Sequence, residues 1–158
     1  MGLGPSTRFL GLVALGQGDY EVARRHYANY LAIARKLSKA GAIAWALLDL
    51  AEATLNLGDR VQPKSLFEES FSIFRDLDSK YGTALCLYFL GLLAQVGGDG
   101  EQAASFFEQG LALAHTTGPI WYRANVLMSL AGAAMRLLEL RNGNPSDFAC
   151  LMDRSSMG

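Results

Sequence analysis

The sequence predicts an all-α fold, a solenoid of about seven antiparallel helices in three and a half hairpins of 40 residues. Three observations lead to this prediction. Residue types recur at a spacing of 40 without a gap, apolar residues recur every three to four positions as on one face of a helix, and a Gly-Asp pair marks each period. A fixed period of this size indicates stacked units, none of which buries its apolar face alone.

Several sets of positions carry the 40-residue spacing. The pair Gly18-Asp19 recurs as Gly58-Asp59 and as Gly98-Asp99. The other repeating sets are Leu10, Leu50, Leu90 and Leu130; Ala44, Ala84 and Ala124; Leu47, Leu87 and Leu127; and Tyr27, Phe67 and Phe107. Because small and apolar residues return at the same place in each unit, we expect these sets to form the core between helices.

Residues that end or begin helices predict where each helix lies. They are expected at about 6–17, 20–37, 40–57, 62–77, 81–96, 101–116 and 119–140. Each Gly-Asp pair separates the two helices of a hairpin, because Gly adopts the left-handed conformation that ends a helix and Asp caps the next one. Polar residues at Ser38, Asp78-Ser79 and Thr116-Thr117 separate consecutive hairpins, and Pro119 suits the first turn of the last helix.

Two boundaries depart from this regularity. Pro63 disfavours helical conformation at the residue before it, so the fourth helix is expected to begin late, near Pro63 itself. The stretch Asn142-Gly143-Asn144-Pro145 breaks the last helix, and the 40-residue spacing ends there. We therefore divide the chain into a flexible N-terminus at 1–6, a helical repeat domain at 7–140, and a tail at 141–158 that is a short helix or disordered.

The composition excludes several classes of function. Hydrophobic residues make up 51% of the 158 residues, charged residues 18%, and the formal net charge is -1, which argues against binding to nucleic acid. Two cysteines make no disulfide framework, so a cytoplasmic protein is expected. The segment 81–98 contains no charged residue, but it occupies the same place in the repeat as 41–58, which carries Asp49 and Glu52. This favours a buried solenoid helix and no membrane association.

No group of residues in the sequence predicts a catalytic, nucleotide-binding or metal-binding site. The stretch 98–103 satisfies the G-x-G-x-x-A pattern of dinucleotide-binding loops, but that loop must follow a strand, and here a helix precedes it. His26 and His115 lie in different units without a second ligand nearby, so no metal site is expected. We therefore predict a protein without catalytic residues or cofactors.

The repeated residues resemble the tetratricopeptide repeat (TPR). The matching positions are Leu10-Gly11, Gly18-Asp19-Tyr20, Ala23, Tyr27 and Leu31 in one copy, and Leu90-Gly91, Gly98-Asp99, Ala103, Phe107 and Leu111 in another. The middle copy departs at Arg60 and Pro63, and the spacing of 40 is longer than the usual repeat. This length is similar to the repeats of kinesin light chains and of LuxR-type and AfsR-type bacterial regulators. The resemblance implies a right-handed solenoid.

The resemblance also implies which face binds a partner. In this family the first helix of each hairpin lines a concave groove that binds a protein or peptide. The positions carried across are Trp45, Leu48, Asp49, Glu52, Leu85, Tyr88, Phe89, Leu92, Gln95, Asn125 and Met128. The family's basic clamp for a terminal carboxylate is absent, since its positions hold residues such as Leu48, Asp49 and Phe89. We therefore expect an apolar helix or an extended segment in the groove.

An alternative function follows from the last helix. The segment 119–140 lacks a complete partner helix, so Leu127, Leu130, Leu137 and Leu138 have no obvious residues to pack against. Solenoids normally need capping elements at their ends. The alternative is a regulatory or sensor fragment of a bacterial transcriptional regulator, which acts through a homodimer formed by this uncapped helix or through control of an attached effector.

Overall fold

The computed structural model describes residues 5–114, 118–124, 127–128, 131–132 and 135. Its helices with complete bounds are α1 (Pro5–Gly16), α2 (Tyr20–Lys36), α3 (Ala40–Asn56), α4 (Val61–Asp76), α5 (Lys80–Val96) and α6 (Gly100–Ala114). Residues 120–124 are also helical, and helical backbone recurs at 127–128, 131–132 and 135. The predicted helix 119–140 lies partly outside the described residues, as does the N-terminus 1–6, and the tail 141–158 lies wholly outside them.

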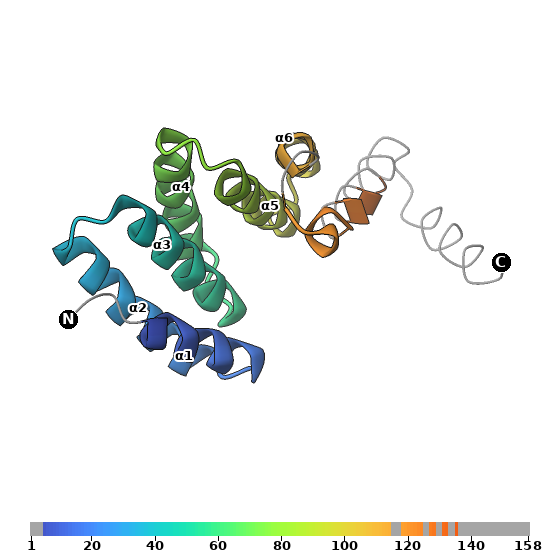
Figure 1. Cartoon of the computed structure of the whole chain (residues 1–158). Helices are drawn as coiled ribbons and strands as arrows, with labels where there is room; N and C mark the ends of the chain where they lie inside the picture. Colours follow the sequence, from blue (N-terminus) through green and yellow to red (C-terminus); the bar gives the residue numbers. More distant parts are fainter. Residues whose placement is uncertain (1–4, 115–117, 125–126, 129–130, 133–134, 136–158) are drawn as a thin grey trace.

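The helices form antiparallel hairpins that stack in chain order. α1 pairs with α2, α3 with α4, and α5 with α6, and each hairpin also packs on the next (Figure 1). The hairpins follow one another along the molecule, so that α1 and α6 lie far apart (Figure 1). The described residues contain helices and turns without a strand. This arrangement confirms the predicted all-α solenoid.

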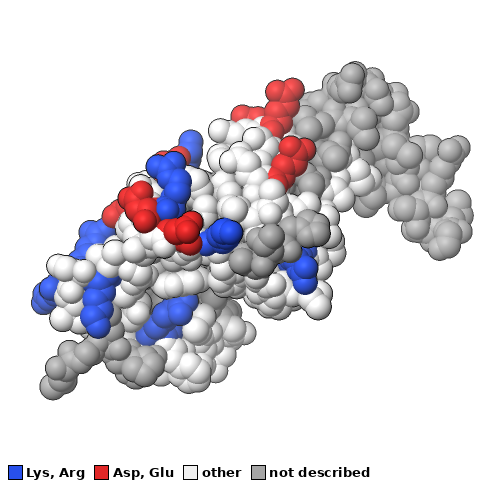
Figure 2. Space-filling view, turned by 45° about the horizontal axis from the view of Figure 1, so that its top comes forward, with Lys and Arg blue, Asp and Glu red and all other residues white. Residues whose placement is uncertain are grey.

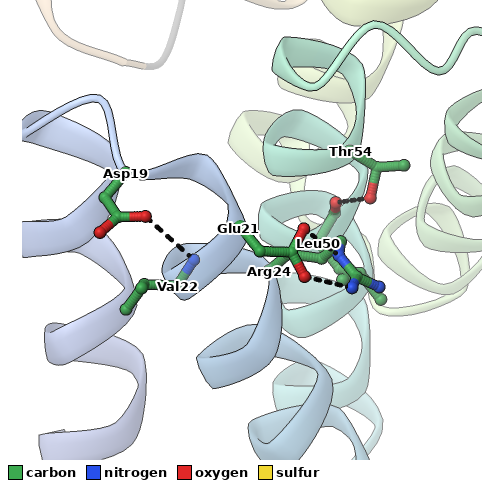
Figure 3. A network of polar contacts seen from close by, with 6 residues as sticks. All are labelled: Asp19, Glu21, Val22, Arg24, Leu50 and Thr54. Atoms are coloured by element: carbon green, nitrogen blue, oxygen red, sulfur yellow. Dashed lines mark hydrogen bonds and ion pairs between the residues drawn. The ribbon is translucent and has the colours of Figure 1, made fainter.

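The Gly-Asp pairs turn the chain within each hairpin as predicted. Gly18, Gly58 and Gly98 have φ of 79°, 94° and 85°, in the left-handed region that glycine adopts without steric cost. The following aspartates cap the next helices. Asp19 accepts a hydrogen bond from the backbone N–H of Val22, as Figure 3 shows, and Asp99 accepts one from Gln102.

Two of the turns between hairpins use residues other than glycine. Ser38 has φ of 51° and Asp78 has φ of 54°, whereas Gly118 occupies the left-handed region in the third such turn. Ser79 then caps α5, because its hydroxyl accepts a hydrogen bond from the N–H of Gly82. The polar residues predicted at the first two boundaries therefore end one helix each, and Ser79 also caps the next, whereas α3 begins after Lys39 without a side-chain cap.

The predicted late start of the fourth helix is wrong. α4 begins at Val61, and Pro63 is the third residue of its first turn, where it is buried. A proline at this place removes no helical hydrogen bond, because the first N–H groups of a helix have no partner within it. Asp59 accepts hydrogen bonds from the N–H groups of Val61 and Gln62, which holds the backbone in helical conformation ahead of the proline.

Most of the repeating positions form the core, but the first leucine set does so only in part, since Leu10 is 50% exposed, Leu50 is half-buried and Leu90 is buried. Tyr27, Phe67 and Phe107, which share one place in the repeat, are each fully buried. Ala44 and Ala84 are buried in the same way, and so are Leu47 and Leu87. Leu127, the next member of that leucine set, is 51% exposed, so the regular burial ends with the last described segment.

Charged side chains lie scattered over the surface. On the face drawn in Figure 2, Lys and Arg are interspersed with acidic and uncharged residues and form no broad field of one sign. Among the described helices, none combines the length and the apolar character that a membrane crossing requires.

Candidate partner-binding hollow

The first helices of the hairpins have more apolar surface than their partners cover. α5 has no charged residue from Tyr81 to Val96, and α3 carries charge only at Asp49 and Glu52. By contrast, α2 and α4 carry charged residues along their length, and α6 carries Glu101 and Glu108 together with uncharged polar residues, so one face of each can be buried and the other hydrated. The additional apolar face of α3 and α5 faces a hollow in the surface.

This hollow has a volume of about 380 Å³. It lies between α1, α3, α5 and the segment that follows Pro119. Its walls are formed by Arg8, Leu12, Trp45, Leu48, Asp49, Glu52, Tyr81, Leu85, Tyr88, Phe89, Leu92, Trp121 and Tyr122. A space of this size accommodates a few side chains of a partner. We call it the central hollow.

The structure brings together eight of the eleven residues predicted for the groove, all of them on α3 and α5. Of the other three, Gln95 and Met128 are not in the wall, since Gln95 is half-buried elsewhere on α5 and Met128 is 69% exposed, and Asn125 lies outside the described residues. The structure thus places these eight residues around the central hollow, and their role in binding stays a prediction.

Five wall residues were missed by the sequence analysis. The 40-residue spacing could have identified two of them, because Arg8 corresponds to the predicted residues Leu48 and Tyr88, and Leu12 corresponds to Glu52 and Leu92. Tyr81 and Trp121 correspond to each other but to none of the predicted groove residues, and Tyr122 corresponds to Gly82. The central hollow is therefore built largely from equivalent positions of successive repeats.

Aromatic side chains form most of one side of the hollow. Trp45 contacts Tyr81 with ring centroids 6.0 Å apart, Tyr81 contacts Tyr122 at 5.9 Å, and Tyr122 contacts both Tyr88 and Trp121. These rings meet edge-on or tilted, an arrangement in which the positive edge of one ring approaches the negative face of another. The rings support one another and form a rigid apolar wall.

Phe89 has a double role in this wall. Its ring stacks on the fully buried ring of Phe67 with centroids 4.9 Å apart and planes 4° from parallel. It also lines the hollow and remains half-buried. Phe89 therefore belongs both to the core between α4 and α5 and to the candidate binding surface.

One part of the wall is polar. Arg8 on α1 donates hydrogen bonds to both carboxylate oxygens of Asp49 on α3, at 2.6 and 3.4 Å, and its guanidinium lies 5.1 Å from the centre of the Trp45 ring. Burial raises the pKa of Asp49, and the hydrogen bond and charge of Arg8 oppose this shift. Burial alone would lower the pKa of Arg8, but the hydrogen bond and charge of Asp49 outweigh it and raise that pKa.

Glu52 lies one helical turn after Asp49 and is half-buried in the same wall. Burial, together with the negative charge of Asp49, raises the pKa of Glu52 from 4.5 to about 7. No hydrogen bond or ion pair within the described residues reaches the Glu52 carboxylate. Its charge is therefore partly desolvated and has no direct counter-ion in this part of the chain.

The hydroxyl of Tyr27 lies close enough to Asp49, Glu52 and Arg8 to be influenced by their charges. It is buried, and among the described residues it has no hydrogen-bond partner. Burial raises the pKa of Tyr27, and the charges of Asp49 and Glu52 add to the shift. An unpaired buried hydroxyl is destabilising, so this part of the structure is less well satisfied than the apolar core.

Within the described residues, no three His, Cys, Asp or Glu side chains come together as a metal site would require. The central hollow offers aromatic faces, aliphatic side chains, one ion pair and one carboxylate. This is the composition of a surface that binds through apolar contact, with charge selecting among partners.

No protein family matches the sequence, and no curated protein does. The fold, however, is similar to several solved structures. BtubC from P. vanneervenii aligns with a TM-score of 0.74 at 16% identity, over 96% of this chain and 63% of that protein. This chain therefore spans less than two thirds of the length of BtubC.

Two further structures share the architecture. The Sgt2 TPR domain from Aspergillus fumigatus aligns with a TM-score of 0.69 at 20% identity, over 89% of this chain and 83% of that one. The TPR-like repeats of a kinesin light chain from Podospora anserina align with a TM-score of 0.71 at 19% identity, over 94% and 71%. At these identities the likeness concerns the fold. The fold of this chain is that of a tetratricopeptide-repeat solenoid.

Proposed function

We propose that the chain is a non-enzymatic protein-interaction module that binds a peptide or a partner helix in the central hollow. The observation that carries the proposal is the aromatic wall around Trp45, Tyr88 and Trp121, which surrounds a space large enough for a partner's side chains. Tryptophan and tyrosine are the residue types that dominate binding energy at interfaces. The TPR-like fold of the neighbouring structures also supports an interaction role.

Tryptophan fluorescence can test whether a peptide binds in the central hollow. The chain contains two tryptophans, and both line the hollow, so their emission reports directly on its occupancy. The probes are peptides selected by the parent chain from a random-peptide display library. Binding of a selected peptide should change the emission of Trp45 and Trp121.

Two pairs of neighbouring residues provide matched variants. Leu12 lines the hollow and is 44% exposed, whereas its neighbour Val13 is 41% exposed and lies outside the wall. Trp121 and Ile120, at 58% and 76% exposure, form a second such pair. Because all four side chains are substantially exposed, each substitution should leave the fold intact.

Leu12→Ser and Trp121→Ala should weaken peptide binding by roughly tenfold or more, as loss of an anchoring side chain does. Val13→Ser and Ile120→Ala should bind as the parent does, measured by peptide anisotropy so that the loss of Trp121 does not remove the signal. Equal affinities across all four variants would refute binding in the central hollow.

A second candidate function is self-association through the segment that follows Pro119. Its described residues include Ile120, Leu127 and Met128, three large apolar side chains that are 76%, 51% and 69% exposed. This supports the alternative of a regulatory fragment that acts as a homodimer. The mass in solution at increasing concentration tests it, and a monomer throughout would exclude it.

A further inference from the structure

The charge of the central hollow is unbalanced. Its wall contains one basic and two acidic side chains, and the basic one, Arg8, is already engaged. Arg8 donates to both oxygens of Asp49 while its guanidinium lies over Trp45. These bonds use two of the five N–H groups of the guanidinium, and the charge of Asp49 offsets that of Arg8. An acidic ligand that approached Arg8 would also meet the Asp49 carboxylate, so Arg8 is poorly placed to recognise an acidic partner.

Glu52 is the group left without a counter-ion. The titratable groups around it are Asp49 on the same helix, Arg8 on α1, Tyr27 on α2 and Tyr88 on α5. Asp49 repels its charge, Arg8 is paired with Asp49, and within the described residues no partner contacts its carboxylate. A cation that entered the hollow would find this carboxylate half-buried, where an ion pair is less screened than at the surface.

The aromatic wall adds to the attraction for a cation. Tyr81, Tyr88 and Trp121 line the same hollow as Glu52. The faces of such rings carry partial negative charge and attract ammonium and guanidinium groups. The contact between Arg8 and Trp45 already uses this interaction within the protein.

We propose that the occupant of the central hollow is a basic amphipathic peptide segment that places a Lys or Arg side chain against Glu52 and an adjacent apolar side chain against the aromatic wall. This inference rests on the proposed function, because it specifies the chemistry of the same ligand. An acidic segment is disfavoured, since its carboxylates would lie beside Glu52 and face an arginine that is already paired.

The selection from a random-peptide display library tests this inference through its sequences. Selections are run with the parent chain, with Glu52→Gln and with Glu108→Gln. Glu108 is exposed on α6, away from the hollow, so its substitution controls for the loss of one negative charge. Glutamine keeps the shape of glutamate, and circular dichroism verifies that each variant is folded.

The parent and Glu108→Gln should select peptides enriched in Lys and Arg next to apolar residues, and Glu52→Gln should lose the basic enrichment. A basic peptide selected by the parent should bind Glu52→Gln about tenfold more weakly, the effect of losing one charge-assisted hydrogen bond. Glu52→Lys, which reverses the charge, should select acidic peptides instead.

Proton release provides an independent measurement. A cation at Glu52 lowers the pKa of its carboxylate, which lies near 7 in the free chain, so binding at neutral pH should release protons. Calorimetry in buffers of different ionisation enthalpy measures this release. The parent should show it, and Glu52→Gln should not.

The outcomes separate the inference from the proposed function. Peptides that depend on Leu12 and Trp121 but carry no basic enrichment, or bind Glu52→Gln with unchanged affinity, would refute the role of Glu52 and leave binding in the hollow in place. If no selected peptide depends on Leu12 or Trp121, the proposed function fails, and the inference fails with it.

Discussion

Gly91 on α5 lies directly beneath the ring of Phe107 on α6. A β-carbon on Gly91 would stand 2.4 Å from Cε1 of that ring, far inside van der Waals contact. The same relationship holds between Gly11 and the ring of Tyr27, at 2.5 Å. Gly11 and Gly91, which share one place in the repeat, are therefore places where two helices approach closely enough for an aromatic ring to rest on the backbone.

Gly91→Ala should lower the free energy of unfolding by about 1 to 3 kcal/mol, because Phe107 is fully buried and the helices must move apart. Gly16→Ala is the matched control, since no atom lies within 4 Å of the new methyl group. It should raise stability by up to about 1 kcal/mol, the helical preference of Ala over Gly. Urea denaturation followed by circular dichroism measures both, and equal effects would contradict this account of the packing.

The sequence predicted helices α1 to α6, apart from the start of α4, and most of the core. Gly18 and Gly98 recur with the aspartates that cap the next helix, and the aromatic set of Tyr27 and Phe107 recurs at the buried positions. Each feature acts locally or through neighbouring helices, so a repeated pattern reveals it. The predicted start of α4 was wrong because a residue before a proline can be helical in the first turn of a helix. Here Asp59 holds Val61 and Gln62 in that conformation through hydrogen bonds to their N–H groups.

The central hollow was only partly predictable. The residues of α3 and α5 follow from the resemblance, but Arg8 and Leu12 were not carried across to the first repeat. The ion pair between Arg8 and Asp49 joins residues 41 positions apart. This ion pair depends on how closely α1 packs on α3 and on the rotamers of both side chains. Neither the distance between the helices nor the rotamers can be predicted from the periodicity of the sequence.

Two tyrosines should respond in opposite ways to the loss of a hydroxyl. Tyr27→Phe removes a buried hydroxyl that has no partner among the described residues, and the equivalent positions of the other repeats hold Phe67 and Phe107. It should be neutral or stabilising by about 1 kcal/mol. Tyr122→Phe removes a hydrogen bond of 2.6 Å to the carbonyl of Ala84 and should destabilise by about 1 kcal/mol.

Thermal and urea denaturation of the two variants provide the measurement. Each substitution removes one oxygen from a buried ring, so each serves as the control for the other. A loss of stability in Tyr27→Phe as large as that in Tyr122→Phe would show that the Tyr27 hydroxyl is satisfied in solution.

The ion pair of Arg8 and Asp49 should behave as a unit. Arg8→Leu leaves the Asp49 side chain, which is 6% exposed, without its cation and should destabilise by about 1 to 3 kcal/mol. The double variant Arg8→Leu/Asp49→Leu should recover most of this loss, since apolar residues already occupy the equivalent positions at Leu48 and Phe89.

A double-mutant cycle completed with Asp49→Leu measures the coupling. We expect the sum of the losses of stability in the two single variants to exceed the loss in the double variant. Strict additivity would mean that the two charges are stabilised independently by solvent, and that Arg8 is free to recognise an anionic partner after all.

Ionisation of Glu52 should lower the free energy of unfolding as the pH rises from the pKa of Glu52 in the unfolded chain to its pKa in the native state. The native pKa is about 7 and the ordinary value is 4.5, so between these limits the native state holds a proton that the unfolded state has released. The free energy of unfolding then decreases with rising pH, and the penalty is complete above pH 7. Glu52→Gln should remove this contribution.

The stability of Glu52→Gln relative to the parent should therefore increase across this window by roughly 1 to 3 kcal/mol, which stays below the limit that about 1.4 kcal/mol per pKa unit sets for the full shift. Urea denaturation at a series of pH values measures it, with Glu108→Gln on the exposed surface of α6 as the baseline for the loss of one carboxylate. A constant difference between Glu52→Gln and the parent would mean that Glu52 is hydrated in solution. Because a hydrated carboxylate gains less from a counter-ion than a desolvated one, that result would also weaken the argument for a cation in the central hollow.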